Sequence, residues 1–198
     1  MWPSAVALSR WLVSNPDIVH GRSVLELGAG CGLTGLVAAG LSPSNVVLTD
    51  FNPKVLENLS HNIALNNVKG TAIGLDFYQQ HGDCMGWIDT EGESHLQVHV
   101  ILAADMICQP ADAVAAAKTI HDALLPDGLA VVVCAGAKHR FGIDIFESEC
   151  HRMELSVQTF NVADLYDGQL VNKDMGMTAG YVDGMTLTMF QIEHALRR

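Results

Sequence analysis

Short apolar runs alternate with helical patterns along most of the chain. The runs that predict strands cover residues 23–27, 45–49, 71–75, 98–104, 129–135, 155–159 and 185–192. The helical patterns between them cover a first helix with apolar residues at positions 5, 8 and 12, and then residues 33–41, 53–66, 111–125 and 143–153. Two polar, glycine-containing stretches, 77–96 and 161–183, predict long loops.

This order predicts the fold class. Continuous apolar strands that alternate with helices indicate a parallel sheet covered on both faces. No helix separates the last two strands, so we expect them to pair antiparallel at one edge. The prediction is an α/β protein with a Rossmann-like, doubly wound, mostly parallel seven-stranded sheet and an antiparallel edge strand. We expect a single domain over residues 1–198, and a helix that starts so close to Met1 leaves an N-terminal truncation open.

Composition supports a folded domain, and charge limits its partners. Apolar residues make up 49% of the 198 positions, enough for a sizeable core, which excludes intrinsic disorder. The formal net charge is −11, so we expect no nucleic-acid partner. An acidic surface suits a cationic, lysine-bearing protein partner, although it is also a common route to solubility.

Cysteine usage and the N-terminus indicate a location. Five cysteines without a Cys-x-x-Cys pair are typical of free thiols in a reducing compartment. No signal peptide and no apolar run of the ~20 residues that span a bilayer are present. We therefore expect a cytoplasmic or nuclear protein with no membrane partner, and we predict no metal site.

Candidate chemistry collects where the predicted strands end. The first strand runs into four glycines within residues 28–35, and the next three strands end at Asp50, Asp76 and Asp105. Ligands of parallel α/β sheets bind beyond the carboxyl ends of the strands, so these residues should face one crevice. Glycine there lets the backbone turn tightly and approach a ligand closely.

The glycine spacing allows more than one cofactor. A P-loop is excluded because Leu36-Val37 stand where Lys-Ser/Thr is required. The segment 30–35 fits G-x-G-x-x-G with Asp50 downstream, so an NAD-dependent oxidoreductase stays open. A carboxylate at Glu26 suits a cationic amine better than a pyrophosphate, and Asp76 adds a second acid. The acidic rim therefore favours a nucleoside cofactor with an amino group and a sulfonium.

At these residues the sequence resembles a known family. Residues 24–35, Val-Leu-Glu-Leu-Gly-Ala-Gly-Cys-Gly-Leu-Thr-Gly, are similar to motif I of the seven-β-strand S-adenosylmethionine-dependent methyltransferases. Residues 48–53 and 55–59, the stretch 62–66, and Ile-Leu-Ala-Ala-Asp at 101–105 resemble the family-16, lysine-methyltransferase-like branch, as does Trp-Pro-Ser-Ala at 2–5. The resemblance covers residues 2 to about 135.

The resemblance implies a cofactor, a reaction and roles for single residues. The cofactor would be S-adenosyl-L-methionine, and the reaction methyl transfer to a lysine side chain of a protein substrate. Asp50 would hold the ribose hydroxyls, and Asp105 would orient the acceptor lysine. The remaining cofactor-binding residues fall into three groups: Glu26, Gly28, Ala29, Gly30 and Gly32 around the methionine moiety, Asp76 and Phe77 beside the adenine, and Trp2 and Ala104 in the cofactor wall.

One departure from the family pattern concerns the substrate side. The family has Asp-x-x-Tyr after the fourth strand, where this chain has Asp105-Met106-Ile107-Cys108. The aspartate is kept and the tyrosine is absent. An interaction module that keeps the methyltransferase fold without catalysis is therefore a second hypothesis.

Overall fold

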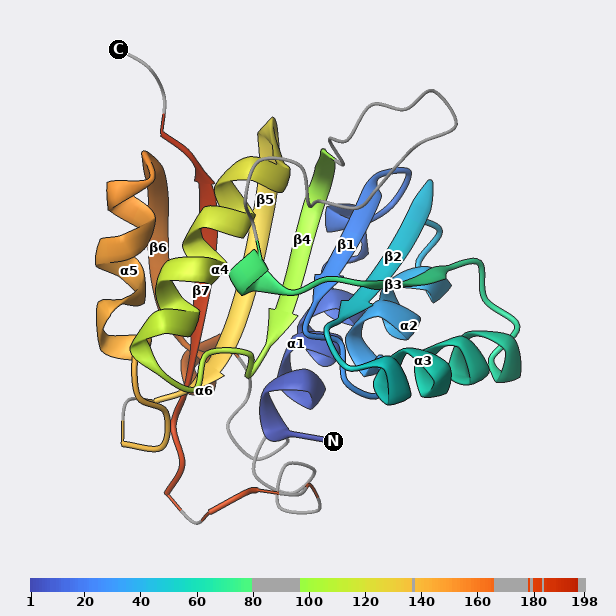
Figure 1. Cartoon of the computed structure of the whole chain (residues 1–198), viewed down its shortest axis with the longest axis horizontal. Coiled ribbons are helices and arrows are strands. Elements are labelled where there is room, and N and C mark those ends of the chain that lie inside the picture. Colours follow the sequence, from blue (N-terminus) through green and yellow to red (C-terminus); the bar gives the residue numbers. More distant parts are fainter. Residues whose placement is uncertain (80–96, 137, 166–177, 179, 183, 196–198) are drawn as a thin grey trace.

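One sheet forms the centre of the molecule (Figure 1). The computed structural model describes residues 1–79, 97–136, 138–165, 178, 180–182 and 184–195. Within them, the sheet has seven strands: β1 (Ser23–Leu27), β2 (Asn45–Asp50), β3 (Thr71–Gly74), β4 (Val98–Ala104), β5 (Leu124–Ala135), β6 (Leu155–Asn161) and β7 (Leu187–His194). The helices are α1 (Pro3–Ser14), η1 (Pro16–Ile18), α2 (Leu33–Gly40), α3 (Pro53–Leu65), η2 (Phe77–Gln79), α4 (Pro110–Ala123), α5 (Ile143–Arg152) and α6 (Val162–Leu165).

The strand order confirms the predicted fold class. It is β3-β2-β1-β4-β5-β7-β6, and the first five strands are parallel. Strand β7 runs antiparallel to both β5 and β6, so the last two strands pair antiparallel as predicted. It lies between β5 and β6, which leaves β6 as the outermost strand on that side.

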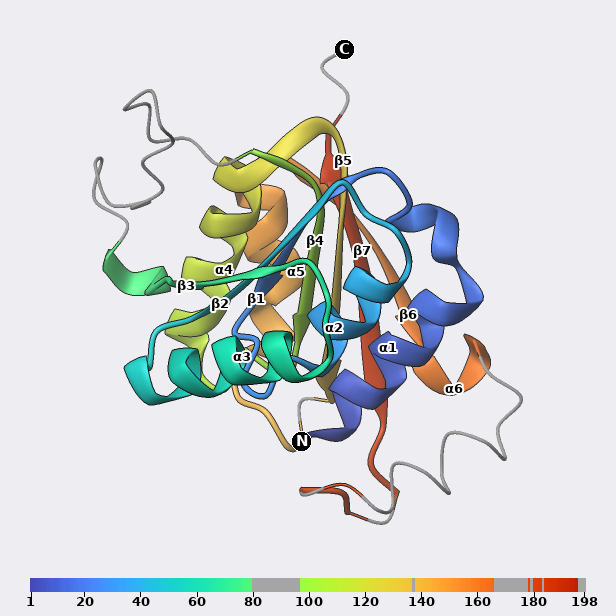
Figure 2. The ribbon, with the colours of Figure 1, turned by 90° about the vertical axis from the view of Figure 1, so that its right-hand side faces the viewer.

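Helices cover both faces of the sheet, because its strands are apolar on both sides (Figure 2). Leu25 and Leu27 pack with the buried side chains of α4 and α5 on one face. Val24 packs with those of α1, α2 and α3 on the other. The alternation along β1 thus places Glu26 on the face that α2 covers.

Several element boundaries differ from the sequence prediction. Strand β5 begins directly after α4, at Leu124, and the residues read as a turn at 126–128 form a bulge inside it. Val98 pairs with Leu124 and Val100 with Leu129, so β4–β5 pairing continues on both sides of the bulge. Strand β6 extends to Asn161 and α6 follows it, where the loop 161–183 was predicted. The last strand covers Leu187–His194 rather than 185–192.

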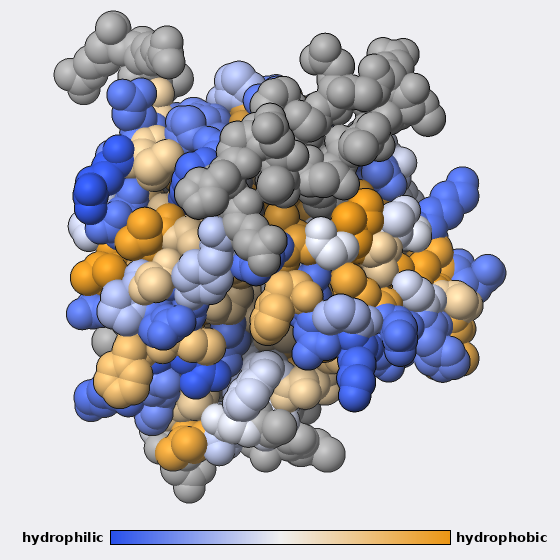
Figure 3. Space-filling model, viewed as in Figure 1, coloured by the Kyte–Doolittle hydropathy of each residue, from blue (hydrophilic) through white to orange (hydrophobic). Residues whose placement is uncertain are grey.

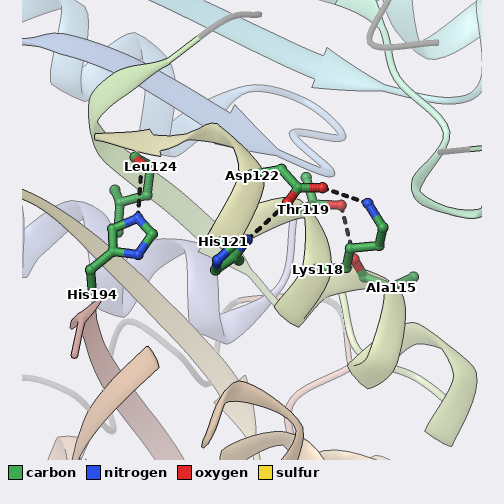
Figure 4. A network of polar contacts seen from close by, with 7 residues as sticks. All are labelled: Ala115, Lys118, Thr119, His121, Asp122, Leu124 and His194. Atoms are coloured by element: carbon green, nitrogen blue, oxygen red, sulfur yellow. Dashed lines mark hydrogen bonds and ion pairs between the residues drawn. The ribbon is translucent and has the colours of Figure 1, made fainter. Parts of the chain in front are cut away.

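A polar network ties the C-terminal end of α4 to its neighbours (Figure 4). Asp122 accepts from Lys118 Nζ at 2.5 Å and contacts His121 Nδ1 at 2.9 Å, while His194 Nε2 lies 2.9 Å from the carbonyl oxygen of Leu124. Burial raises the pKa of Asp122, but the hydrogen bonds from Lys118 and His121 outweigh it and leave that pKa lowered. The side chains of Lys118, His121 and Asp122 are more than a third exposed, so each of these two ion pairs adds at most about 1 kcal/mol.

The surface mixes polar and apolar side chains (Figure 3). Phe51, Leu65 and Phe141 are the most exposed large apolar residues of the described chain. Among the residues that the structure describes, no helix combines the length and the apolar character that a bilayer span needs.

Candidate active site

A pocket of about 400 Å³ opens at the carboxyl ends of β1 to β4. Within the described residues it is lined by Gly28, Asp50, Phe51, Leu75, Asp76, Phe77, Tyr78, Asp105, Met106, Cys108 and Asp112. Four of these are aspartates, and none is a lysine or an arginine. The pocket has the size of small-molecule sites, and its charge favours a cationic ligand.

The glycines after β1 adopt backbone conformations that other residues rarely take. Gly28, Gly30 and Gly32 have φ values of 61°, 55° and 82°, all in the left-handed region. A Cβ on Gly28 would lie 3.2 Å from Met106 Cβ and 4.0 Å from Phe77 Cζ. The missing side chain therefore keeps this wall of the pocket open to a ligand.

Asp50 is held at the end of β2 by the loops on either side of it. Its Oδ2 accepts from Gly30 N at 3.1 Å, and its Oδ1 accepts from Asn52 N at 3.0 Å. A carboxylate offers about four lone-pair positions, so each oxygen keeps capacity for a further donor. The carboxylate is thus oriented by the backbone before any ligand arrives.

Glu26 is buried beneath the glycine loop and bonds to the start of α2. Its side chain is 2% exposed, and its Oε2 accepts from Gly35 N, the first turn of α2, at 2.9 Å. Burial raises the pKa of Glu26 to about 8, against the opposing effect of that hydrogen bond. Glu26 is not among the residues that line the pocket, so its predicted contact with the methionine moiety stays a prediction.

Asp105 meets a partner that the sequence did not assign to it. The Arg140 guanidinium donates to both carboxylate oxygens, at 3.1 Å from Nε and 2.5 Å from Nη2. The same guanidinium lies 5.2 Å from the centre of the Trp2 ring, within cation–π range. Asp105 also has φ 60°, an uncommon backbone conformation for a residue with a side chain.

A second polar cluster, of Tyr78, Gln109 and Asp112, lies at the pocket. Asp112 Oδ2 accepts from Cys108 N at 2.8 Å and from Gln109 N at 3.0 Å at the start of α4. Its other oxygen accepts from the Tyr78 hydroxyl, which in turn accepts from Gln109 Nε2 at 3.1 Å. Tyr78 comes from η2, so the cluster joins two separate segments of the chain.

The structure brings together most of the predicted strand-end residues. Gly28, Asp50, Asp76, Phe77 and Asp105 all line the pocket. The other predicted cofactor residues lie in the surrounding loops or strands and, in the described part of the chain, do not line it: Trp2, Glu26, Ala29, Gly30, Gly32 and Ala104. Gly30 acts on the pocket through Asp50, and Trp2 lies against Arg140.

Sequence reasoning missed Tyr78 and Asp112. Tyr78 directly follows the predicted adenine-side pair at 76–77, which was the available signal. Asp112 had a separate signal, because it lies at the third helical position after Gln109 and completes a capping box there. The pairing of Arg140 with Asp105 was not foreseen from the sequence either.

A family model described as lysine methyltransferase matches residues 1–148. This chain belongs to the lysine methyltransferase family. The match covers the glycine loop, all four pocket aspartates and Arg140. It also favours S-adenosylmethionine over NAD as the ligand of the glycine loop.

Curated relatives match only part of the chain. The rat electron transfer flavoprotein beta subunit lysine methyltransferase is 43% identical over 67 residues, which are 34% of this chain and 26% of that protein. The Arabidopsis thaliana calmodulin-lysine N-methyltransferase is 41% identical over 75 residues, or 36% of this chain and 25% of that protein. The aligned segment thus spans about a quarter of these relatives.

Solved structures share the fold. A TehB-like methyltransferase from Corynebacterium glutamicum superposes with TM-score 0.65 at 16% identity, covering 95% of this chain and 87% of that one. The T. thermophilus 16S rRNA N2 G1207 methyltransferase, solved with AdoMet and guanosine, gives TM-score 0.61 at 17% identity, covering 96% and 43%. At such identities the likeness establishes the fold alone.

Proposed function

We propose that this protein is an S-adenosylmethionine-dependent protein-lysine N-methyltransferase. The observation that carries the proposal is the pocket itself, which has four aspartates among its described lining residues, one of them, Asp105, paired with Arg140. It lies next to the glycine loop with its left-handed backbone conformations. The cofactor carries a sulfonium and an amino group, and the acceptor is a lysine side chain. Both are cationic, so one acidic pocket suits both partners of the reaction.

The residues present fit the cofactor. Gly28 leaves its side of the pocket open, because a Cβ there would crowd Met106 and Phe77. Asp50 offers the free lone pairs of a carboxylate already oriented by Gly30 N and Asn52 N, which suits a pair of ribose hydroxyls. Asp76 and Phe77 line the same pocket on the side where the adenine is expected.

When bound, the cofactor supplies an electrophilic methyl group to an acceptor with a free lone pair. The protein's own part is to bring the acceptor nitrogen into line with the bond between the sulfonium sulfur and the methyl group, and to exclude water from the site of transfer. Asp105 lies at the pocket wall, where Arg140 fixes the direction of its carboxylate. We propose that Asp105 orients the acceptor nitrogen from this position.

The relatives suggest acceptors to try first. The rat relative is named for the electron transfer flavoprotein beta subunit and the Arabidopsis relative for calmodulin. We propose a protein acceptor of this kind. We also propose a cytoplasmic location, supported by the free thiols of Cys31, Cys108, Cys134 and Cys150.

A thermal-shift comparison tests the cofactor assignment. S-adenosylmethionine and S-adenosylhomocysteine should raise the melting temperature of the protein as their concentration rises, because a ligand of the folded state stabilises it by mass action. NAD at the same concentrations should not. Stabilisation by NAD alone would contradict the proposal. Cofactor binding without methyl transfer to any protein would instead support the non-catalytic interaction module.

A further inference from the structure

The segment after β4 places a thiol where the family pattern has a phenol. Cys108 is exposed at the pocket, and its backbone N–H is bonded to Asp112. Burial of the sulfur raises the pKa of the Cys108 thiol, although the Arg140 charge opposes this. At neutral pH the group is therefore a weakly polar thiol, a poor substitute for a hydroxyl as a hydrogen-bond acceptor.

A phenol reaches the same wall of the pocket from another element. Tyr78, Cys108 and Asp112 all line the pocket. The Tyr78 hydroxyl is bonded to the very carboxylate that holds the Cys108 backbone. The Asp112 carboxylate therefore links the phenol oxygen of Tyr78 to position 108, where the family tyrosine is absent.

The hydrogen bonds of this phenol use its proton and the acceptor position of its oxygen. Its proton is donated to Asp112, and one lone pair accepts from Gln109 Nε2 at 3.1 Å. A phenol oxygen offers one good in-plane acceptor position, so an N–H of an incoming amine takes the position that the exposed Gln109 amide holds here. The Asp112 hydrogen bond raises the pKa of Tyr78, which keeps the phenol neutral and its geometry unchanged around neutral pH.

The hydroxyl is not needed to cap α4. Asp112 already caps α4 through two backbone N–H groups, of Cys108 and Gln109, without help from Tyr78. The Tyr78 side chain is 49% exposed, more than a packing residue of the core would be. The polar contacts therefore hold the hydroxyl at the pocket while they join η2 to the start of α4.

We propose that Tyr78 supplies, from the segment after β3, the phenol that position 108 lacks, and that its oxygen orients the acceptor amine. This inference rests on the proposed function, because it assigns a role in the same reaction. Asp112 acts as a positioning residue, since it holds the hydroxyl and does not touch the acceptor, whereas the Gln109 amide gives up its place to the amine.

Initial rates of labelled methyl transfer from S-adenosylmethionine into cell-lysate protein test the proposal. Tyr78→Phe keeps the ring and removes the oxygen, so the rate should fall about 10-fold, the effect of one lost hydrogen bond. The affinity for S-adenosylhomocysteine, measured by calorimetry, should stay within about 2-fold, because the change is on the acceptor side. The matched control Tyr181→Phe removes a hydroxyl outside the pocket lining and should leave both values unchanged.

A rescue experiment separates an orienting hydroxyl from a structural one. Adding Cys108→Tyr to the Tyr78→Phe variant places a phenol back on the same wall and should recover most of the lost rate. A Tyr78→Phe protein that turns over at the wild-type rate, or a double variant that binds S-adenosylhomocysteine but recovers nothing, overturns the inference. Wild-type protein that binds no S-adenosylhomocysteine overturns the proposed function as well, so the two failures are told apart.

Discussion

Asp50 holds its carboxylate between Gly30 N and Asn52 N and turns toward the pocket. Asp50→Ala should therefore weaken binding of S-adenosylhomocysteine by about 1.5–3 kcal/mol, the range for hydrogen bonds to a charged group. Titration calorimetry measures the change. Asp127→Ala, an exposed substitution in the β5 bulge far from the pocket, is the matched control and should bind like wild type. Equal affinities for the two variants would remove Asp50 from the cofactor site.

Glu26 makes stability depend on pH in an unusual direction for an acid. Its pKa is raised by burial from 4.5 to about 8, so the folded state prefers the protonated form. This contribution to stability is complete below the unfolded pKa and is lost as pH rises through the folded pKa, from about 4.5 to about 8. The loss amounts to at most about 5 kcal/mol, at about 1.4 kcal/mol per pKa unit.

Glu26→Gln keeps an acceptor for Gly35 N and removes the titration. Urea unfolding at several pH values should show that the free energy of unfolding of this variant falls less between pH 5 and pH 8 than that of wild type. Glu57→Gln, an exposed change on α3, should follow the wild-type profile. Parallel profiles for all three proteins would refute the raised pKa as a source of pH dependence.

At the scale of elements, helix α2 packs closely against the sheet at its first turn, whereas its last residue, Gly40, has open space around it. A Cβ on Gly35 would lie 2.5 Å from Glu26 Oε2 and 2.8 Å from Leu48, whereas a Cβ on Gly40 would meet nothing within 4 Å. Gly35→Ala should thus destabilise the fold by about 1–3 kcal/mol through overpacking. Gly40→Ala should stabilise it by about 0.4–1 kcal/mol. Thermal unfolding compares the two, and a neutral Gly35→Ala would show that α2 moves away freely.

The ion pair of Asp105 and Arg140 links the end of β4 to the segment after β5. Asp105 is 2% and Arg140 20% exposed, so Arg140→Ala would leave a buried carboxylate unpaired. We expect a loss of about 3 kcal/mol, at the lower end for broken buried pairs. Arg152→Ala breaks a pair with Glu149 in which the arginine is 75% exposed, and should cost less than about 1 kcal/mol. Chemical denaturation giving both variants the same stability would contradict this reading of the pair.

At the scale of the whole molecule, the sequence was sufficient for the fold and for one side of the site. Strands that are apolar on both faces and alternate with helices have few stable arrangements, so the sheet could be predicted from them. The carboxyl ends of such strands meet at one edge, which is why Gly28, Asp50, Asp76 and Asp105 were found together. The left-handed conformations of Gly28, Gly30 and Gly32 agree with the tight turn that glycine was expected to allow there.

The wall formed by Tyr78, Asp112 and the Asp105–Arg140 pair could not be predicted, because its contacts join segments that are distant in sequence. Arg140 reaches Asp105 across 35 positions, and Tyr78 reaches Asp112 across 34. The bulge in β5 was missed because Pro126-Asp127-Gly128 has the composition of a turn, and only pairing with β4 decides otherwise. Local pattern carries no signal for such tertiary contacts.

The most direct test of the account is transfer of a labelled methyl group from S-adenosylmethionine by the purified 198-residue protein. Protein from a cell lysate, together with electron transfer flavoprotein beta subunit and calmodulin, serves as acceptor, and mass spectrometry locates the label. The account predicts label on the Nε atom of a lysine, and loss of that label with Asp50→Ala. Label found only on other residue types, or none at all from a protein that binds the cofactor, would contradict it.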